Sequence, residues 1–199
     1  MKLWISLCKQ AEYIVDIGAN SGVYALVAKS INPNAKVFAF EPQPMFYKRL
    51  LKNVEINNFN IACYNYAISD VNDSIIIGNY AESNKFINVT AITLDAFIES
   101  QSIPKIDLMK IDVEMHEPFV LRGFFKYLKI FQPVIIIEIL NDEIANKIEQ
   151  LVSDCNYLYF NINEQKGVKQ TKHLEKSDSF NYLLCNEMVA KYLGFVETN

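Results

Sequence analysis

A glycine-bearing loop and a later carboxylate have the spacing of a nucleoside-binding site. The segment Asp16–Gly22 follows a short apolar run and precedes an amphipathic one, which predicts a strand, a loop and a helix. Such a loop lets backbone N–H groups and a helix N-terminus approach a ligand closely. Glu41 follows a second apolar run about 20 residues later, where nucleoside-binding folds place the carboxylate that accepts hydrogen bonds from ribose. An ordinary turn would account for the glycines alone, but the acidic residues favour a binding site.

The residues of this loop favour S-adenosylmethionine over a dinucleotide. A dinucleotide fold uses G-x-G-x-x-G, whereas the second of these positions is Asn20 here and no third glycine follows. Asp16 ends the strand, so its carboxylate would repel a pyrophosphate. S-adenosylmethionine carries a sulfonium, an amino-acid end and a ribose, and it suits an acidic position better.

A second group of polar residues follows a later apolar strand. Asp112, Glu114, His116 and Glu117 crowd the loop after the segment Ile106–Ile111. Polar loop residues commonly face only solvent, but ligands of open α/β sheets bind at the carboxyl ends of the strands. We therefore predict that this group lies beside the Asp16 loop.

The elements that must position these residues alternate along the chain. Apolar runs and helical periodicity predict a parallel sheet with helices on both faces, in one domain spanning residues 1–199. The predicted strands are Tyr13–Ile17, Lys36–Phe40, Ile61–Ile68, Ile106–Ile111, Pro133–Leu140, Tyr157–Asn161 and Tyr182–Cys185. The predicted helices are Val23–Ser30, Met45–Asn57, a short one capped by Thr93, Glu117–Leu128, Asp142–Asp154 and Asn186–Leu193. Ile75–Ile77 and Ile87–Ile92 are interpreted as a small hairpin or an extended insertion, and Asn163–Ser179 as a polar loop.

The motifs together resemble the FkbM-type methyltransferases, which are class I enzymes that use S-adenosylmethionine. The resemblance covers about residues 13 to 140. It rests on the segments Asp16–Gly22, Phe40–Pro42, Thr93–Asp95, Lys110–Glu114, His116-Glu117 and Val120–Gly123 and on Glu138, in family order. It implies an α/β Rossmann-like fold with a seven-stranded, mostly parallel sheet in the order 3-2-1-4-5-7-6, with the last-formed strand antiparallel. It also implies methylation of a hydroxyl group on a sugar, a glycan or a secondary metabolite.

These arguments assign two sets of site residues. We predict that S-adenosylmethionine is contacted by Asp16, Gly18, Ala19, Asn20, Gly22, Glu41, Pro42, Ala67, Ile68 and Asp112. The predicted catalytic residues are His116, Asp112, Glu114 and Glu138. His116 suits a general base because its reference pKa is near neutrality, but bracing of the following helix explains it equally well. Asp112 and Glu138 end adjacent strands, where they would bind the cofactor's amino group, orient the acceptor, or share a divalent cation such as Mg²⁺.

Two departures from the family bear on activity. Met115 stands where the family usually has glycine, so it would be strained if the backbone there needs a positive φ, or would narrow the pocket if substrate passes closely. The chain also begins about a dozen residues before its first strand, so we expect an incomplete cover over the cofactor. A second subunit of a homo-oligomer would supply such a cover. These departures keep a non-catalytic binding or scaffold protein open, and an NAD-dependent dehydrogenase ranks third because of Asn20.

The composition indicates a globular, cytoplasmic protein. The chain has 199 residues, 51 % apolar and 21 % charged, with a net charge of −4 and no basic patch, which disfavours a nucleic-acid partner. The four cysteines are scattered without a C-x-x-C motif, as expected of free thiols in a reducing compartment. No apolar stretch has the length of a membrane span, and Met1–Cys8 is shorter than a signal-peptide core. The expected partner is a small-molecule or glycan acceptor.

Overall fold

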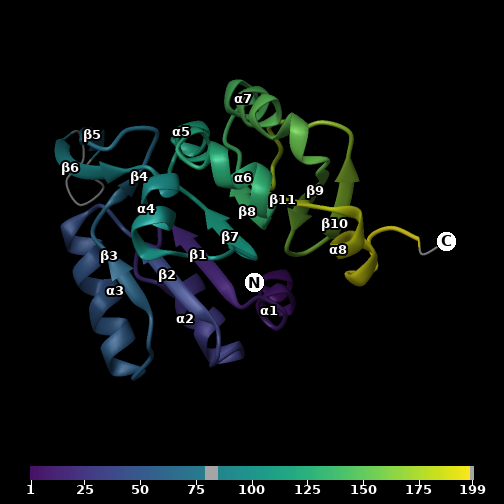
Figure 1. The fold of residues 1–199 in the computed structure, drawn as a ribbon. Helices are drawn as coiled ribbons and strands as arrows, with labels where there is room; N and C mark the ends of the chain where they lie inside the picture. Colours follow the sequence, from purple (N-terminus) through teal and green to yellow (C-terminus); the bar gives the residue numbers. More distant parts are fainter. Residues whose placement is uncertain (79–84, 198–199) are drawn as a thin grey trace.

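An eight-stranded mixed sheet forms the centre of the protein (Figure 1). The computed structural model describes residues 1–78 and 85–197. The strand order is β10-β9-β11-β8-β7-β1-β2-β3. The strands are β1 (Tyr13–Ile17), β2 (Lys36–Phe40), β3 (Ala62–Tyr64), β7 (Leu108–Ile111), β8 (Val134–Glu138), β9 (Leu158–Asn163), β10 (Gly167–Thr171) and β11 (Asn181–Cys185).

The predicted strand order is confirmed, with one strand added at an edge. Without β10, the sheet reads 3-2-1-4-5-7-6 in chain order of its strands, and β11 is antiparallel to both of its neighbours. The prediction of a polar loop over Asn163–Ser179 was wrong for Gly167–Thr171, because β10 pairs antiparallel with β9. The side-chain oxygen of Asn163 accepts from the backbone N–H groups of Gln165 and Lys166, and Gly167 has a φ of +100°, so a tight turn returns the chain onto β9.

Helices cover both faces of the main sheet (Figure 1). One face packs against α1 (Lys2–Cys8), α2 (Val23–Ile31), α3 (Pro44–Ile56) and α8 (Glu187–Tyr192). The other face packs against α4 (Leu94–Gln101), α5 (Glu117–Arg122), α6 (Phe125–Phe131) and α7 (Asp142–Val152), which the 3-10 turn η1 (Ser153–Cys155) follows. None of the described helices has the length and apolar character that crossing a membrane requires.

The central strands are buried on both faces, as predicted. β7 lies parallel to β8 and to β1, with Met109 opposite Ile135 and Lys110 opposite Asp16. Val15 and Met109 point into the cluster beneath α4 to α7, whereas their neighbours Ile14 and Leu108 point into the cluster beneath α1 to α3. This alternation places Asp16 and Lys110 together on the α2 face.

The predicted strand Ile61–Ile68 is divided into two strands. β3 stays in the main sheet, but β4 (Ala67–Ile68) leaves it and pairs with β6 (Phe86–Ile92). Asn65 lies at the break, where its side-chain amide donates to the backbone oxygens of Glu41 and Pro42 at 2.8 and 2.9 Å. The hydrogen bonds therefore hold the chain at the end of β2 while it turns away.

The predicted helix Glu117–Leu128 is also divided, into α5 and α6. The backbone oxygen of Gly123, at the break, accepts from the N–H of Asp95 at 2.9 Å instead of continuing the helix. The Asp95 carboxylate in turn accepts from the N–H groups of Lys126 and Tyr127 and caps α6. A β-carbon on Gly123 would lie 1.9 Å from the backbone oxygen of Ser69, so only glycine fits this close approach.

The predicted hairpin is confirmed and forms a small second sheet. β5 (Ser74–Gly78) pairs antiparallel with β6, and the order is β4-β6-β5, so β5 is an edge strand. Residues 79–84, which follow β5 in the sequence, lie outside the described part of the chain. Thr93 caps α4 as predicted, because its hydroxyl accepts from the N–H of Ala96 at 3.2 Å.

Candidate cofactor and acceptor cavity

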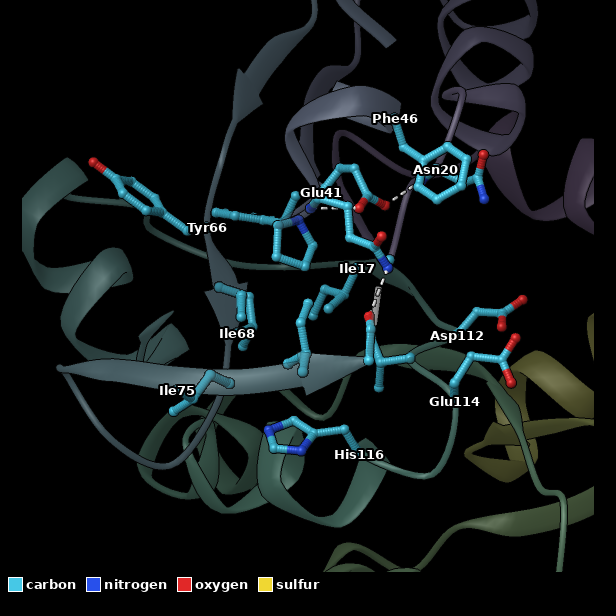
Figure 2. Close-up of a pocket in the computed structure, with 18 of the residues that line it drawn as sticks. Ile17, Asn20, Glu41, Phe46, Tyr66, Ile68, Ile75, Asp112, Glu114 and His116 are labelled. Carbon is cyan, nitrogen blue, oxygen red and sulfur yellow. Dashed lines mark hydrogen bonds between the residues drawn. The ribbon is translucent and has the colours of Figure 1, made fainter. Parts of the chain in front are cut away.

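A cavity of about 610 Å³ opens at the carboxyl edge of the main sheet, and the β5 hairpin forms its outer wall (Figure 2). This volume suits a ligand of cofactor size. Figure 2 shows Glu41 and Asn20 on one side, Asp112 and Glu114 on another, and His116 across β5 from Glu41. The lining residues are Ile17, Gly18, Asn20, Phe40, Glu41, Pro42, Gln43, Phe46, Tyr66, Ala67, Ile68, Ile75, Ile76, Ile77, Gly78, Asp112, Val113, Glu114, His116 and Glu138.

The backbone of the loop after β1 lies close to the ends of both neighbouring strands, β2 and β7. Gly18 has a φ of +79°, and a β-carbon there would lie 1.9 Å from the backbone oxygen of Asp112. The N–H groups of Gly18 and Ala19 donate to the Phe40 oxygen at 3.0 and 2.9 Å. Asn20 has a φ of 51°, in the left-handed region that asparagine tolerates. The loop therefore closes onto the ends of both neighbouring strands and presents Gly18 and Asn20 to the cavity.

Glu41 is held in place by two backbone groups. Its carboxylate accepts from the N–H of Asn20 and from the N–H of Gln43, both at 2.8 Å. Burial raises the pKa of Glu41, and the two hydrogen bonds oppose that shift. A carboxylate has about four acceptor positions, so it keeps acceptor capacity for a ligand in the cavity that it lines.

Asp16 lies beneath the loop instead of facing the cavity. Its side chain is 1 % exposed and accepts from the N–H of Ala25, in the first turn of α2, at 3.0 Å. Burial raises the pKa of Asp16 to about 7, while the charge of Lys110 opposes the shift. Asp16 thus caps α2 and fixes the loop's position, which is a structural role that the sequence did not predict.

Glu138 and Asp112 end the neighbouring strands β8 and β7, as predicted, and they share the cavity with Glu114. Asp112 forms an ion pair with Lys110 at 2.7 Å, and Lys110 is 1 % exposed. The pKa of Glu138 is raised to about 7 by burial and then by the charges of Asp112 and Glu114. Within the described residues, the buried Oε2 of Glu138 has no hydrogen-bond partner.

Glu117 braces the loop that carries Glu114 and His116. It is fully buried, and its Oε1 accepts from the N–H of Val113 at 3.1 Å. Burial raises the pKa of Glu117 to about 6. Glu114 and Met115 both have positive φ values, of 54° and 74°, so the loop turns through two left-handed residues. The strained backbone that the sequence predicted for Met115 is therefore present.

The alternative that Met115 narrows the pocket was wrong. Its side chain is 53 % exposed, and its sulfur lies 3.4 Å from the side-chain nitrogen of Asn141. Among the described residues that line the cavity, Met115 is absent. The left-handed backbone turns the side chain outward, so replacing it with glycine would leave the cavity's volume unchanged.

His116 lines the cavity, and its burial favours the neutral ring. Burial lowers its pKa, which the charge of Asp70 opposes. Its Nε2 lies 3.0 Å from the Ser69 hydroxyl, and that hydroxyl donates to Asp70 at 3.3 Å. If Ser69 gives its one proton to Asp70, it accepts from Nε2–H, and the imidazole lone pair is then on Nδ1. The ring also stacks on Phe119 with 4.4 Å between centroids, so both of the roles predicted for His116 are compatible with its position.

The outer wall of the cavity was not predicted to be part of the site. β5 contributes Ile75 to Gly78, and the side-chain amide of Gln43 donates to the Gly78 oxygen at 3.2 Å, which ties the hairpin to the loop after β2 (Figure 2). Phe46 and Tyr66 add aromatic surface. The sequence indicated the hairpin, but the hydrogen bond between it and Gln43 depends on tertiary structure. In the sequence, only the polar side chain of Gln43, two residues after Glu41, could have indicated such a hydrogen bond.

The structure brings most of the predicted residues together. All four predicted catalytic residues, His116, Asp112, Glu114 and Glu138, line the cavity. Seven of the predicted cofactor residues also line it, namely Gly18, Asn20, Glu41, Pro42, Ala67, Ile68 and Asp112. Asp16, Ala19 and Gly22 are outside the described lining, and a cofactor contact by these three stays a prediction. No group of three or more His, Cys, Asp or Glu within residues 1–78 and 85–197 is arranged to hold a metal ion, and the suggested divalent cation stays a prediction.

Comparison with known families gives a match that covers most of this site. The model of the methyltransferase FkbM domain matches residues 16–159. The chain belongs to the FkbM methyltransferase family. The family match includes the glycine loop, Glu41 and the segment from Lys110 to Glu138, and membership implies S-adenosylmethionine as the methyl donor.

Individual relatives agree with the family and the fold. The hexuronic acid methyltransferase AglP of Haloferax volcanii is 28 % identical over 145 residues, which are 68 % of this chain and 59 % of the relative. The crystal structure of methyltransferase FkbM from Methylobacillus flagellatus has a TM-score of 0.60 at 14 % identity, covering 87 % of this chain and 43 % of that one. Precorrin-6y C5,15-methyltransferase from Geobacter metallireducens has a TM-score of 0.56 at 13 % identity, over 94 % and 87 % of the two chains. The chain therefore spans less than two thirds of AglP, and the two structures support the fold alone.

Proposed function

We propose that this FkbM-family protein is an S-adenosylmethionine-dependent O-methyltransferase that acts on a hydroxyl group of a sugar, a glycan or a secondary metabolite. One observation supports this most strongly. Glu41, the carboxylate at the position that accepts from ribose in nucleoside-binding folds, lines the same cavity as the titratable residues His116 and Glu138. A cofactor bound to the first residue would therefore face an acceptor bound near the other two.

Glu41 and the loop after β1 are the proposed cofactor side of this cavity. Glu41 would accept from the ribose hydroxyls with its remaining lone pairs, because Asn20 and Gln43 already fix its orientation. The backbone of Ala67 and Ile68 would flank the adenine, beside the aromatic ring of Tyr66. Asp112 would accept from the cofactor's amino group. The bound sulfonium would supply a methyl group for in-line displacement.

His116 and Glu138 are the proposed acceptor side. A hydroxyl is a weak nucleophile, and a positioned base that removes its proton contributes about 10²- to 10⁴-fold to the rate. In the tautomer that donates from Nε2–H to Ser69, His116 has its lone pair on Nδ1, and the hydrogen bond fixes the ring. In this proposal, His116 accepts the hydroxyl proton as the methyl group is transferred, and Glu138 orients the acceptor.

A methyl-transfer assay tests the proposal. Tritiated S-adenosylmethionine would be incubated with the protein and a panel of glycosides, nucleotide sugars and phenols, with and without Mg²⁺. We expect methylation at oxygen. His116→Ala should lower kcat by about 10²- to 10⁴-fold and leave S-adenosylhomocysteine affinity nearly unchanged.

His173→Ala is the matched control, because His173 lies on the surface and pairs with Glu149 at 2.8 Å. Wild-type turnover by His116→Ala would refute the base assignment. Methylation only at nitrogen would refute the O-methyltransferase proposal. The non-catalytic alternative was motivated by Met115 and by the short N-terminus, and the first of these grounds loses force because that side chain points out of the cavity.

A further inference from the structure

The cavity has a strongly one-sided set of charges. Its lining contains the carboxylates of Glu41, Asp112, Glu114 and Glu138, and within the described lining there is no Lys or Arg. His116 does not balance them, because burial lowers its pKa and favours the neutral ring. An anionic acceptor would enter this field without a cationic partner from the wall.

Lys110 and Arg122, beside the site, are paired with other groups. Lys110 is 1 % exposed, pairs with Asp112 at 2.7 Å and lies over the ring of Tyr24. Arg122 pairs with Asp70 at 2.9 Å and stacks on Phe119. Lys85 precedes β6 and is outside the lining, and the sequence of residues 79–84 contains neither Lys nor Arg.

One carboxylate of the lining is poorly satisfied in the free protein. The buried Oε2 of Glu138 has no hydrogen-bond partner among the described residues. Of the charged groups that act on Glu138, Asp112, Glu114 and Glu117 raise its pKa, and only Lys110 lowers it. A ligand that brings a donor or a positive charge to this oxygen would relieve that cost, whereas a ligand carboxylate would add to it.

We infer that the acceptor is a neutral or ammonium-bearing hydroxyl compound, such as a sugar or an amino sugar, and that uronic acids are rejected. The inference rests on the proposed function and narrows its substrate class. It separates this chain from AglP, whose name gives a hexuronic acid as the substrate. The four carboxylates and the absence of a cation in the described lining carry it.

Sinefungin provides a test that needs no known acceptor. This analogue carries an ammonium group in place of the methylsulfonium, so the ammonium projects to where the acceptor hydroxyl would bind. S-adenosylhomocysteine has no charge at its sulfur. Calorimetry at about pH 8, above the raised pKa of Glu138, should therefore give a Kd for sinefungin about tenfold lower than that for S-adenosylhomocysteine. Glu138→Gln and Glu114→Gln should each reduce the ratio of the Kd for S-adenosylhomocysteine to the Kd for sinefungin. Glu187→Gln should leave this ratio unchanged, because Glu187 is exposed on α8.

Each outcome of this experiment decides something. If S-adenosylhomocysteine binds but sinefungin binds no more tightly, the inference is overturned and the proposed function stands. If sinefungin binds more tightly but the ratio of the two Kd values is the same in Glu138→Gln and Glu114→Gln as in the wild type, the cavity carboxylates do not cause the tighter binding. The inference also fails in that case. If S-adenosylhomocysteine does not bind, the proposed function itself fails. In the methyl-transfer assay, faster methylation of methyl β-D-glucuronide than of methyl β-D-glucoside would likewise overturn the inference.

Discussion

Replacing Glu41 with glutamine separates its proposed ligand contact from its structural contacts. The carboxylate accepts from two backbone N–H groups, those of Asn20 and Gln43, each at 2.8 Å. Glutamine has a similar shape but only one acceptor oxygen, and its NH₂ group would face a donor. One backbone N–H therefore loses its hydrogen-bond acceptor in Glu41→Gln. The ribose hydroxyls lose a charged hydrogen-bond acceptor.

The two losses have different magnitudes and different readouts. A buried N–H without an acceptor should lower the free energy of unfolding by about 1–3 kcal/mol. Hydrogen bonds to a charged group contribute about 1.5–3 kcal/mol, so the Kd for S-adenosylhomocysteine should rise by about 10- to 150-fold. The first loss appears in the melting temperature, and the second appears in calorimetry at a temperature where the variant is folded.

A pair of nucleosides makes the ribose contact specific. 5′-Methylthioadenosine should bind the wild-type protein more tightly than its 2′,3′-dideoxy counterpart, and Glu41→Gln should abolish that difference. Glu55→Gln is the control, because Glu55 lies on the exposed side of α3 and pairs with Lys52 at 3.0 Å. If Glu41→Gln melts earlier but binds S-adenosylhomocysteine within about threefold of wild type, Glu41 has only a structural role and the reasoning is refuted.

Three further predictions follow from the strained, titratable and buried positions. Met115→Gly should remove the left-handed strain at φ 74°, so the free energy of unfolding should rise by about 1 kcal/mol and Tm by about 2–4 °C. The control Met188→Gly, in helix α8, should instead lower Tm. Equal changes of Tm in the two variants would contradict strain at Met115. Because the pKa of Glu138 is raised to about 7, the folded protein keeps a proton that the unfolded chain has lost, so stability should fall as the pH rises from about 4 to about 7. Glu138→Gln should therefore raise Tm at about pH 8 and not at about pH 4, as measured by calorimetric melting, and a gain at both values would rule out titration as its cause. Ile136→Asp should abolish soluble folding, because Ile136 is 4 % exposed in a central strand, and a soluble variant with a cooperative melt would count against the fold.

The sequence predicted the central strands of the main sheet and the residues at its carboxyl edge. Tyr13–Ile17 and Lys36–Phe40 are strands with the predicted bounds, because their apolar runs are bordered by clear turn residues. Glu41, Asp112 and Glu138 each follow or end such a strand, and parallel strands bring their carboxyl ends to one edge. Their convergence in one cavity therefore follows from the strand order alone.

The features that the sequence missed depend on contacts between distant segments. The break between α5 and α6 is fixed by Asp95, and the break after β3 is fixed by Asn65, neither of which lies in the interrupted apolar pattern. The direction of Met115 depends on two left-handed residues in succession. Asp16 could have been placed correctly, because it is two residues from Ile14 in a strand and therefore shares its face.

Calorimetric titration of the purified protein with S-adenosylhomocysteine and, separately, with NAD tests the central claim most directly. The claim is that the cavity containing Glu41 and Asn20 is a site for S-adenosylmethionine. The account predicts saturable binding of S-adenosylhomocysteine at one site per chain and no binding of NAD. Binding of NAD without binding of S-adenosylhomocysteine would contradict it.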